Sequence, residues 1–229
     1  MDTIQIPSAI FGRWARIGIC GSSGTGKSVL VQRLIEDSAR LFEAKTDLIL
    51  YFYLVKNEEA FQNLAGIVGE IEFHQGLDRL EEVLESHAES AKSKGIMLVV
   101  EDLQFDGFNS KALASVFTAY CHHLPLTAVL FTMQHPFQRG SRYSTIINRN
   151  MTHYIFSDSP RLKSSLIVLG RDLDPGHPMR LLRVFEKAMR KGIHPYLMVD
   201  LTAKNDQFFS GILSHEQLQV YRDVTESMK

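Results

Sequence analysis

Residues 21–28 read Gly-Ser-Ser-Gly-Thr-Gly-Lys-Ser and match the Walker A spacing G-x-x-x-x-G-K-[ST] at every fixed position. Glycines in this pattern let the backbone curl until successive N–H groups face a phosphate, and a helix that follows adds its dipole. Lys27 is expected to reach the β- and γ-phosphates of a nucleotide, and the Ser28 hydroxyl to coordinate Mg²⁺. The expected nucleotide-binding residues are Gly21, Ser22, Ser23, Gly24, Thr25, Gly26, Lys27, Ser28 and Val29.

Two adjacent acids, Glu101 and Asp102, follow the apolar segment 96–100 in the Walker B position. Mg²⁺ requires a carboxylate opposite the loop hydroxyl, and hydrolysis requires a group that orients water. By position Glu101 takes the metal side and Asp102 activates water, but the usual order is Asp before Glu. Because Glu reaches further than Asp, both acids and Ser28 are candidate metal ligands. The alternative is a pair of surface acids that cap a strand.

Gln134 ends the apolar segment 126–133 and is followed by a polar stretch that contains three arginines. Its amide both donates and accepts hydrogen bonds, which suits a residue that senses the γ-phosphate or holds the attacking water. ATPases that work as rings commonly present an arginine to the neighbouring subunit's phosphate. Any of Arg139, Arg142 and Arg149 fits this role, and Arg142 and Arg149 are the candidate catalytic residues. Solvated polar residues are the alternative interpretation for all of these positions.

Short apolar runs alternate with helical patterns along the chain, which is typical of a parallel sheet covered on both faces. Together with the Walker A motif, this predicts an α/β fold of three layers with a mostly parallel central sheet, the P-loop NTPase of the additional-strand (ASCE) type. We expect one domain over 1–203 and a polar, peripheral C-terminal tail over 204–229 that packs on this domain or extends from it. The expected strands are 15–20, 47–55, 70–74, 96–100, 126–133, 152–157 and, as the last, 196–199, and the expected helices are 27–41, 77–91, 111–122, 161–170 after Pro160, and 179–190.

The chain has 229 residues, of which 45% are apolar and 22% charged, with a net charge of -1. This composition excludes disorder over most of the length and provides one sizeable core. The start of the chain lacks a signal-peptide pattern, and no segment has the roughly 18 apolar residues of a membrane span. Cys20 and Cys121 are too few for a disulfide framework, which fits a reducing compartment, and Cys121-His122-His123 lacks a second ligand pair at metal-site spacing.

Basic residues are concentrated in the segment 161–191, which carries eight basic residues against three acidic ones. This segregation is compatible with a track for a phosphate backbone, with contacts between subunits, or with an ordinary solvated helix face. The basic members are Arg161, Lys163, Arg171, Arg180, Arg183, Lys187, Arg190 and Lys191, and the acidic members are Asp172, Asp174 and Glu186.

In their order along the chain and in their residue sequences, the segments resemble the FtsK–HerA superfamily. Within it, they resemble the A32-like genome-packaging ATPases of large DNA viruses, virophages, polinton-type elements and adintoviruses. Four stretches carry the resemblance: GSSGTGKS, IEFHQGL at 71–77, LVVEDLQ at 98–104, and MQHPFQRGSRYSTIINRNMTHYIFSDSPR at 133–161. The last block is the most specific, and the resemblance covers roughly residues 12–172. The chain departs from the family at Glu101, where Asp is usual, and by about one extra residue around 146–151.

The resemblance implies an ATPase that uses ATP and Mg²⁺ to translocate double-stranded DNA into a preformed capsid. The implied assembly is a homo-oligomeric ring, a pentamer or hexamer, in which ATP lies between neighbours and one of them supplies an arginine. The implied partners are double-stranded DNA and a capsid or portal vertex protein, without a membrane. The implied location is inside the virus-infected host cell, in cytoplasm or nucleus, with association with the virion as a further option.

Three other functions remain open on the sequence. A cellular-type DNA translocase or helicase would belong to the same superfamily, and a nucleotide or small-molecule kinase would share the loop. A nucleotide-gated assembly factor or switch is supported by the reversed acidic pair. The sequence disfavours a GTPase because no N-K-x-D segment follows the acids, an ABC cassette because L-S-G-G-Q is missing, and an AAA+ protein because no helical lid pattern follows the core.

Overall fold

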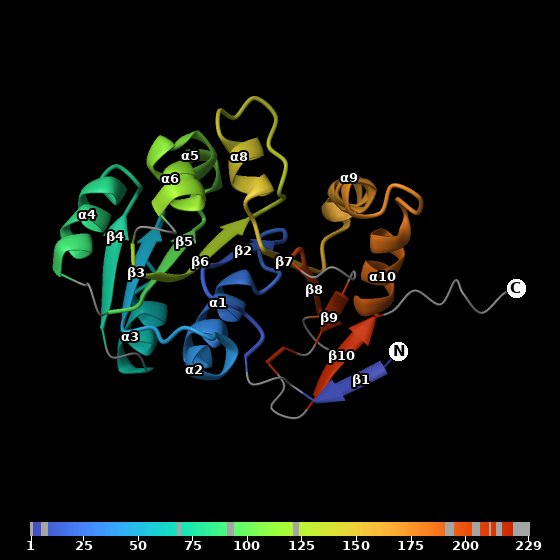
Figure 1. Cartoon of the computed structure of the whole chain (residues 1–229), viewed down its shortest axis with the longest axis horizontal. Helices are drawn as coiled ribbons and strands as arrows, with labels where there is room; N and C mark the ends of the chain where they lie inside the picture. The colour runs from blue at the N-terminus through green and yellow to red at the C-terminus, as the bar shows by residue number, and fades with distance from the viewer. Residues whose placement is uncertain are drawn as a thin grey trace, which may run out of the picture.

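The computed structural model describes residues 2–5, 9–67, 70–90, 94–120, 124–190, 195–202, 207–210, 212–213 and 217–221. Within these residues, ten strands form one sheet and the helices form a layer on each of its faces (Figure 1). The strands are β1 (Asp2–Gln5), β2 (Ala15–Cys20), β3 (Leu48–Tyr53), β4 (Ile71–Gln75), β5 (Ile96–Glu101), β6 (Leu126–Met133), β7 (His153–Ser157), β8 (Tyr196–Asp200), β9 (Gln207–Ser210) and β10 (Gln217–Tyr221). The helices are α1 (Lys27–Glu36), α2 (Ser38–Leu41), α3 (Glu58–Ile67), α4 (Leu80–Ser90), α5 (Gln104–Asn109), α6 (Lys111–Ser115), α8 (Ser144–Arg149), α9 (Lys163–Leu173) and α10 (Arg180–Ala188), with a π turn at Val116–Tyr120 and a 3₁₀ turn at Pro160–Leu162.

The strand order of the sheet is β1-β10-β9-β8-β7-β2-β6-β5-β3-β4. The six strands from β7 to β4 pair in parallel, and the remaining strands join antiparallel. β6 lies between β2, which leads into the Walker A loop, and β5, which ends at the acidic pair. This inserted strand defines the additional-strand type. The predicted α/β, three-layer, mostly parallel fold is therefore confirmed.

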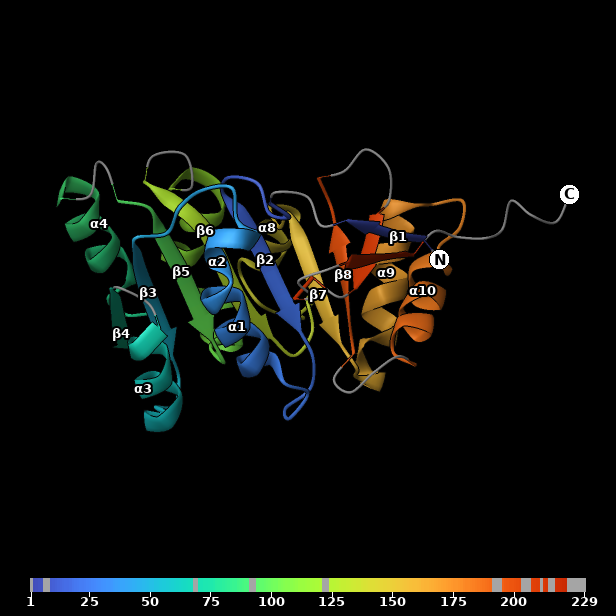
Figure 2. The ribbon, with the colours of Figure 1, turned by 90° about the horizontal axis from the view of Figure 1, so that it is seen from below.

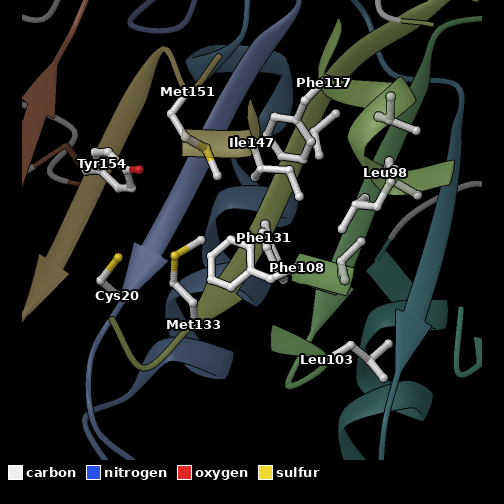
Figure 3. Close-up of a cluster of buried hydrophobic side chains, with 14 of the residues drawn as sticks. Cys20, Leu98, Leu103, Phe108, Phe117, Phe131, Met133, Ile147, Met151 and Tyr154 are labelled. Carbon is white, nitrogen blue, oxygen red and sulfur yellow. The ribbon is translucent and has the colours of Figure 1, made fainter. Parts of the chain in front are cut away.

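The core has two parts because the parallel strands are buried on both faces. Alternation along β5 sends Leu98 to one face and Val99 to the other, and both side chains are inaccessible to solvent. Helices α4, α5, α6, α8, α9 and α10 cover the face of Leu98, where Phe108 and Phe131 pack edge to face (Figure 3). Helices α1, α2 and α3 cover the face of Val99 and lie in front of the sheet in Figure 2. The continuous apolar strands of the sequence thus reflect burial on two sides.

Two expected helices differ in detail from the structure. The predicted helix 27–41 consists of α1 and α2, which meet at Asp37, and the helix predicted for 111–122 changes from α6 to a π turn that ends at Tyr120. Apolar spacing alone does not distinguish a continuous helix from one with a changed hydrogen-bond register. Cys121, His122 and His123, where we expected no metal site, lie outside the described residues.

The C-terminal region differs more clearly from expectation. β8 is not the last strand, because β9 and β10 extend the same sheet and β1 pairs with β10 at its edge. Phe208, Phe209 and Ile212 are buried in the core. The described residues of β9 and β10 therefore belong to the sheet, while the division into 1–203 and 204–229 stays a prediction. Among the described residues, no helix has the length and apolarity to cross a membrane.

Candidate nucleotide-binding site

The Walker A loop runs from the end of β2 to the start of α1 and depends on its glycines. Gly24 and Gly26 have φ angles of 80° and 84°, in the left-handed region that side chains with a Cβ disfavour. Gly21 is required for space, because a Cβ there would lie 2.5 Å from Thr25 Oγ1 and 3.0 Å from Ser157 Cβ. The curled loop thus has the glycine-dependent geometry of a phosphate cradle.

Lys27 turns back into this loop. Its side chain is 8% exposed, and its ammonium donates a hydrogen bond to the carbonyl of Ser22 at 3.1 Å, while the Thr25 hydroxyl donates to the same carbonyl at 2.8 Å. Ser28 and Val29 are exposed at the first turn of α1. The loop therefore holds a buried positive charge beside a helix N-terminus, an arrangement suited to a polyphosphate.

The parallel pairing brings Gln134 beside the loop. Cys20 at the end of β2 pairs with Met133 at the end of β6, and the Gly21 N–H donates to the Met133 carbonyl at 3.0 Å. Gln134, the next residue, is exposed at the same edge of the sheet. The expected position of this strand, between the loop strand and the acidic strand, is correct. The role of the Gln134 side chain stays a prediction.

Glu101 is held by a residue that no sequence motif indicated. It faces the α1 side of the sheet, where the hydroxyl of Tyr51 on the adjacent β3 donates a hydrogen bond to its Oε2 atom. Tyr51 is 3% exposed, and burial together with the negative charges of Glu101 and Asp102 raises the pKa of its phenol. The phenol therefore stays protonated and remains a donor to the carboxylate.

Asp102 has an unusual backbone and faces a different cleft. Its φ angle of 55° is left-handed, and its N–H donates to the hydroxyl of buried Thr132 at 2.9 Å. A non-glycine residue held in this conformation stores about 1–2 kcal/mol of strain, and such strain is concentrated at functional sites. Asp102, Thr132 and Gln134 line one cleft of about 320 Å³. The structure thus brings the second acid and the glutamine together.

Gln104 supports this cleft from the first turn of α5 and is a second residue that the sequence interpretation missed. Its Oε1 accepts the Gln134 N–H at 2.6 Å, and its Nε2 donates to the His135 carbonyl at 3.1 Å. The amide therefore fixes the chain at the end of β6. Its place in the stretch LVVEDLQ was the only available signal, because no spacing rule joins residues 30 positions apart across a sheet.

Glu101, on the α1 face of the sheet, is a suitable ligand for a magnesium ion. Glu101 Oε1 is buried and has no hydrogen-bond partner among the described residues, although the other oxygen is paired with Tyr51. A buried carboxylate oxygen without a partner is costly unless a cation or water completes it. The Ser28 hydroxyl at the start of α1 adds an oxygen donor on the same face and the same edge of the sheet. Oxygen ligands of this kind are the ones that Mg²⁺ prefers.

A second cleft of about 320 Å³ adjoins the loop on the side of α1. Its wall is largely apolar and includes Val29, Leu30, Tyr196 and Leu213, with Arg33 as its charged member. The Leu213 N–H donates to the Tyr196 hydroxyl at 3.2 Å, which ties the segment after β9 to β8. The chain near its C-terminus thus forms part of the surface beside the phosphate-binding loop.

The two candidate arginines lie away from these clefts. Arg142 is exposed, and its main-chain N–H donates to Asn109 Oδ1 at 3.2 Å. Arg149 is exposed at the end of α8, where it lines a cleft of about 510 Å³ together with Arg139 and Tyr154. Neither Arg142 nor Arg149 is among the residues that line the two clefts at the loop and the acids. This placement leaves both available to another molecule, and their role stays a prediction.

The fold is shared with solved P-loop NTPase structures, whereas no protein-family model and no curated protein matches the sequence. The genome packaging NTPase B204 from Sulfolobus turreted icosahedral virus 2, solved with ATP-gammaS, superposes with a TM-score of 0.54 at 13% identity over 85% of this chain and 96% of that chain. A KaiC-like protein from Pyrococcus horikoshii OT3 superposes with a TM-score of 0.49 at 13% identity, over 96% of this chain and 100% of that chain. EssC (ATPases 2 and 3) from Geobacillus thermodenitrificans superposes with a TM-score of 0.47 at 12% identity, over 90% of this chain and 39% of that chain. The similarity is one of fold, and it is consistent with the FtsK–HerA-type P-loop ATPase that the sequence resembles.

Replacing Tyr51 by Phe is expected to raise the Mg²⁺ concentration that gives half-maximal ATP hydrolysis about 10-fold, because residues that orient a metal ligand typically contribute 10–100-fold to metal affinity. The Phe ring keeps the contacts with Phe61 and Phe73, at centroid distances of 5.7 Å and 5.6 Å. Tyr53→Phe is the matched control, since Tyr53 also packs on Phe61, at 4.8 Å. An equal Mg²⁺ requirement in both variants would show that Tyr51 is only a core residue.

Proposed function

We propose that this chain is a magnesium-dependent ATPase that hydrolyses ATP to ADP and phosphate and uses the reaction to move double-stranded DNA into a preformed capsid. The observation that carries the ATPase proposal is the meeting of three features at one edge of the sheet. These are the glycine loop with buried Lys27, the acidic pair 101–102, and Gln134 directly after the strand between them.

In this proposal, the main-chain N–H groups of 21–28 and the Lys27 ammonium bind the phosphates. The apolar cleft with Val29 and Tyr196 takes the nucleobase. Glu101 and Ser28 would hold Mg²⁺, which would supply positive charge next to the phosphates. Asp102 accepts a proton from the attacking water, and Gln134 positions that water in the cleft that both residues line.

DNA packaging is the finer part of the proposal. It is supported by the sequence resemblance to A32-like packaging ATPases and by the shared fold with a viral genome packaging NTPase. We further propose a homo-oligomeric ring in the infected cell, docked on a capsid or portal vertex protein. Arg142 or Arg149, both exposed on their own subunit, would then reach a neighbour's ATP.

A nucleotide-gated assembly factor is the second candidate function. It is favoured by the order of the acids, because Glu at position 101 and Asp at position 102 reverse the usual pair and weaken the expectation of fast turnover. Such a switch binds ATP stoichiometrically and releases it slowly, independently of DNA.

The deciding experiment measures ATP turnover by the full chain with and without double-stranded DNA. A motor is expected to be stimulated several-fold by DNA, since translocation couples hydrolysis to the bound duplex. Tight ATP binding with slow turnover that DNA leaves unchanged would favour the switch, and the absence of ATP binding would refute both functions.

A further inference from the structure

Helix α10 has one buried and one strongly basic face. Leu181, Leu182, Val184, Phe185 and Ala188 are buried in the core under the helix. Arg183 and Lys187 are exposed, as is Arg190 just beyond the last helical turn. Their spacing of four and three residues places them along one side of the helix.

The charges on this face have no acidic partner in the part of the chain that the structure describes. Two neighbouring bases have acidic partners: Lys163 pairs with Glu186 at 3.0 Å, and Arg180 pairs with Asp174 at 3.5 Å. Among the described residues, no acidic side chain forms an ion pair with Arg183, Lys187 or Arg190. The face therefore presents three positive charges directly to solvent.

The dimensions of the face fit a phosphate backbone. The first and last of its bases are seven positions apart in sequence, which corresponds to about 10 Å at a helical rise of about 1.5 Å per residue. One strand of a duplex carries a phosphate about every 3.4 Å along its axis, so the face spans about three phosphates. Contacts of this kind neutralise phosphates without reading bases, as a motor that moves any sequence requires.

The face is also connected to the nucleotide-binding loop. α10 packs against α9, and the two helices lie together over the β7–β8 part of the sheet (Figure 1). The 3₁₀ turn that leads into α9 begins after Ser159, whose hydroxyl lies 2.6 Å from the hydroxyl of Ser22 in the loop. The loop is thus hydrogen-bonded to the segment that leads into α9, the helix against which α10 packs.

We propose that Arg183, Lys187 and Arg190 form a contact surface for the backbone of double-stranded DNA. This inference rests on the proposed function and assigns its DNA contact to a helix.

The test compares wild type with the triple variant Arg183→Gln, Lys187→Gln, Arg190→Gln in salt titrations of binding to a duplex of mixed sequence. Loss of three phosphate contacts is expected to reduce the slope of log K against log[salt] by about 2.7, and to lower affinity at least about 10-fold at low salt. DNA stimulation of ATP turnover is expected to fall with affinity, while basal turnover is unchanged because none of the three residues lies at the loop or the acids.

The matched control replaces Lys45, Arg79 and Lys94 by Gln, which changes the net charge equally. These exposed bases already pair with Asp47, Glu82 and Glu70, and we expect the wild-type slope. A wild-type slope in the α10 variant overturns the inference, as does a change of oligomeric state without a change of DNA affinity, which would indicate a subunit contact. If the α10 variant does not fold, the three single variants, each expected to lower the slope by about 0.9, replace it. If wild type binds no DNA, both this inference and the proposed motor fail.

Discussion

Lys27→Ala is expected to reduce kcat/KM for ATP by at least about 100-fold, because removing one preorganised charge from a transition-state site costs roughly 10²–10³ in rate. The ammonium is buried in the loop against the Ser22 carbonyl, 3.1 Å away, where the phosphates would lie. The variant therefore loses the charge partner of the phosphates. Steady-state turnover and thermal stabilisation by ATP measure the effect, since a bound ligand raises the melting temperature by mass action.

Lys111→Ala is the control for this variant, because Lys111 is exposed on α6 and belongs to none of the clefts at the site. Unchanged turnover in Lys27→Ala would refute the site. Mixing Lys27→Ala with Arg142→Ala or Arg149→Ala protein extends the test to the proposed ring. Since mixed interfaces would combine an intact loop with an intact arginine, one of the mixtures is expected to recover activity. Recovery in neither mixture would contradict a shared site.

Glu101→Gln and Asp102→Asn are expected to impair ATP hydrolysis in different ways. Asp102→Asn should lower kcat about 10²–10⁴-fold with ATP affinity retained, because it removes the proton acceptor. Asn tolerates the left-handed φ of 55° about as well as Asp, so the backbone should be undisturbed. Glu101→Gln should instead raise the required Mg²⁺ concentration at least about 10-fold. Tyr51 still has a carbonyl oxygen to donate to in that variant.

Mg²⁺ titrations of turnover, together with nucleotide binding, separate the two acids. Asp106→Asn provides the control, because Asp106 is an exposed acid on α5 near the same edge. If Asp102→Asn instead raised the Mg²⁺ requirement and Glu101→Gln lowered kcat, Asp102 would be the metal ligand. Wild-type behaviour in both variants would mean that the pair only caps the strand, and the proposed mechanism would then be wrong.

The sequence by itself determined the architecture around the loop. The Walker A spacing located the phosphate-binding loop, and the apolar runs located β2, β3, β5, β6 and β7 to within about two residues. Both signals are local: a turn requires glycines at fixed offsets, and a strand buried on two faces must be apolar throughout. The parallel order then followed from the helices between strands, which put Gln134 beside the loop.

Only the tertiary structure showed what supports the acids. Tyr51 reaches Glu101 across 50 residues of sequence, and Gln104 reaches Gln134 across 30, because neighbouring strands of a parallel sheet are joined by long crossovers. In sequence, Tyr51 is one more aromatic residue of a buried strand. Its hydroxyl gains significance only through the carboxylate that the register of β3 and β5 places beside it.

The C-terminal strands and the exposed basic side chains of α10 also became apparent only in the tertiary structure. Gln207–Ser210 and Gln217–Tyr221 are short and rich in polar residues, so no apolar run marked them, yet they complete the sheet and bring Leu213 to the cleft beside the loop. The sequence shows that the segment 161–191 is rich in basic residues, but it does not show which of them form ion pairs. Burial of one face of α10 exposes Arg183, Lys187 and Arg190 along its other side, because a helix packed against a core directs its remaining side chains to solvent.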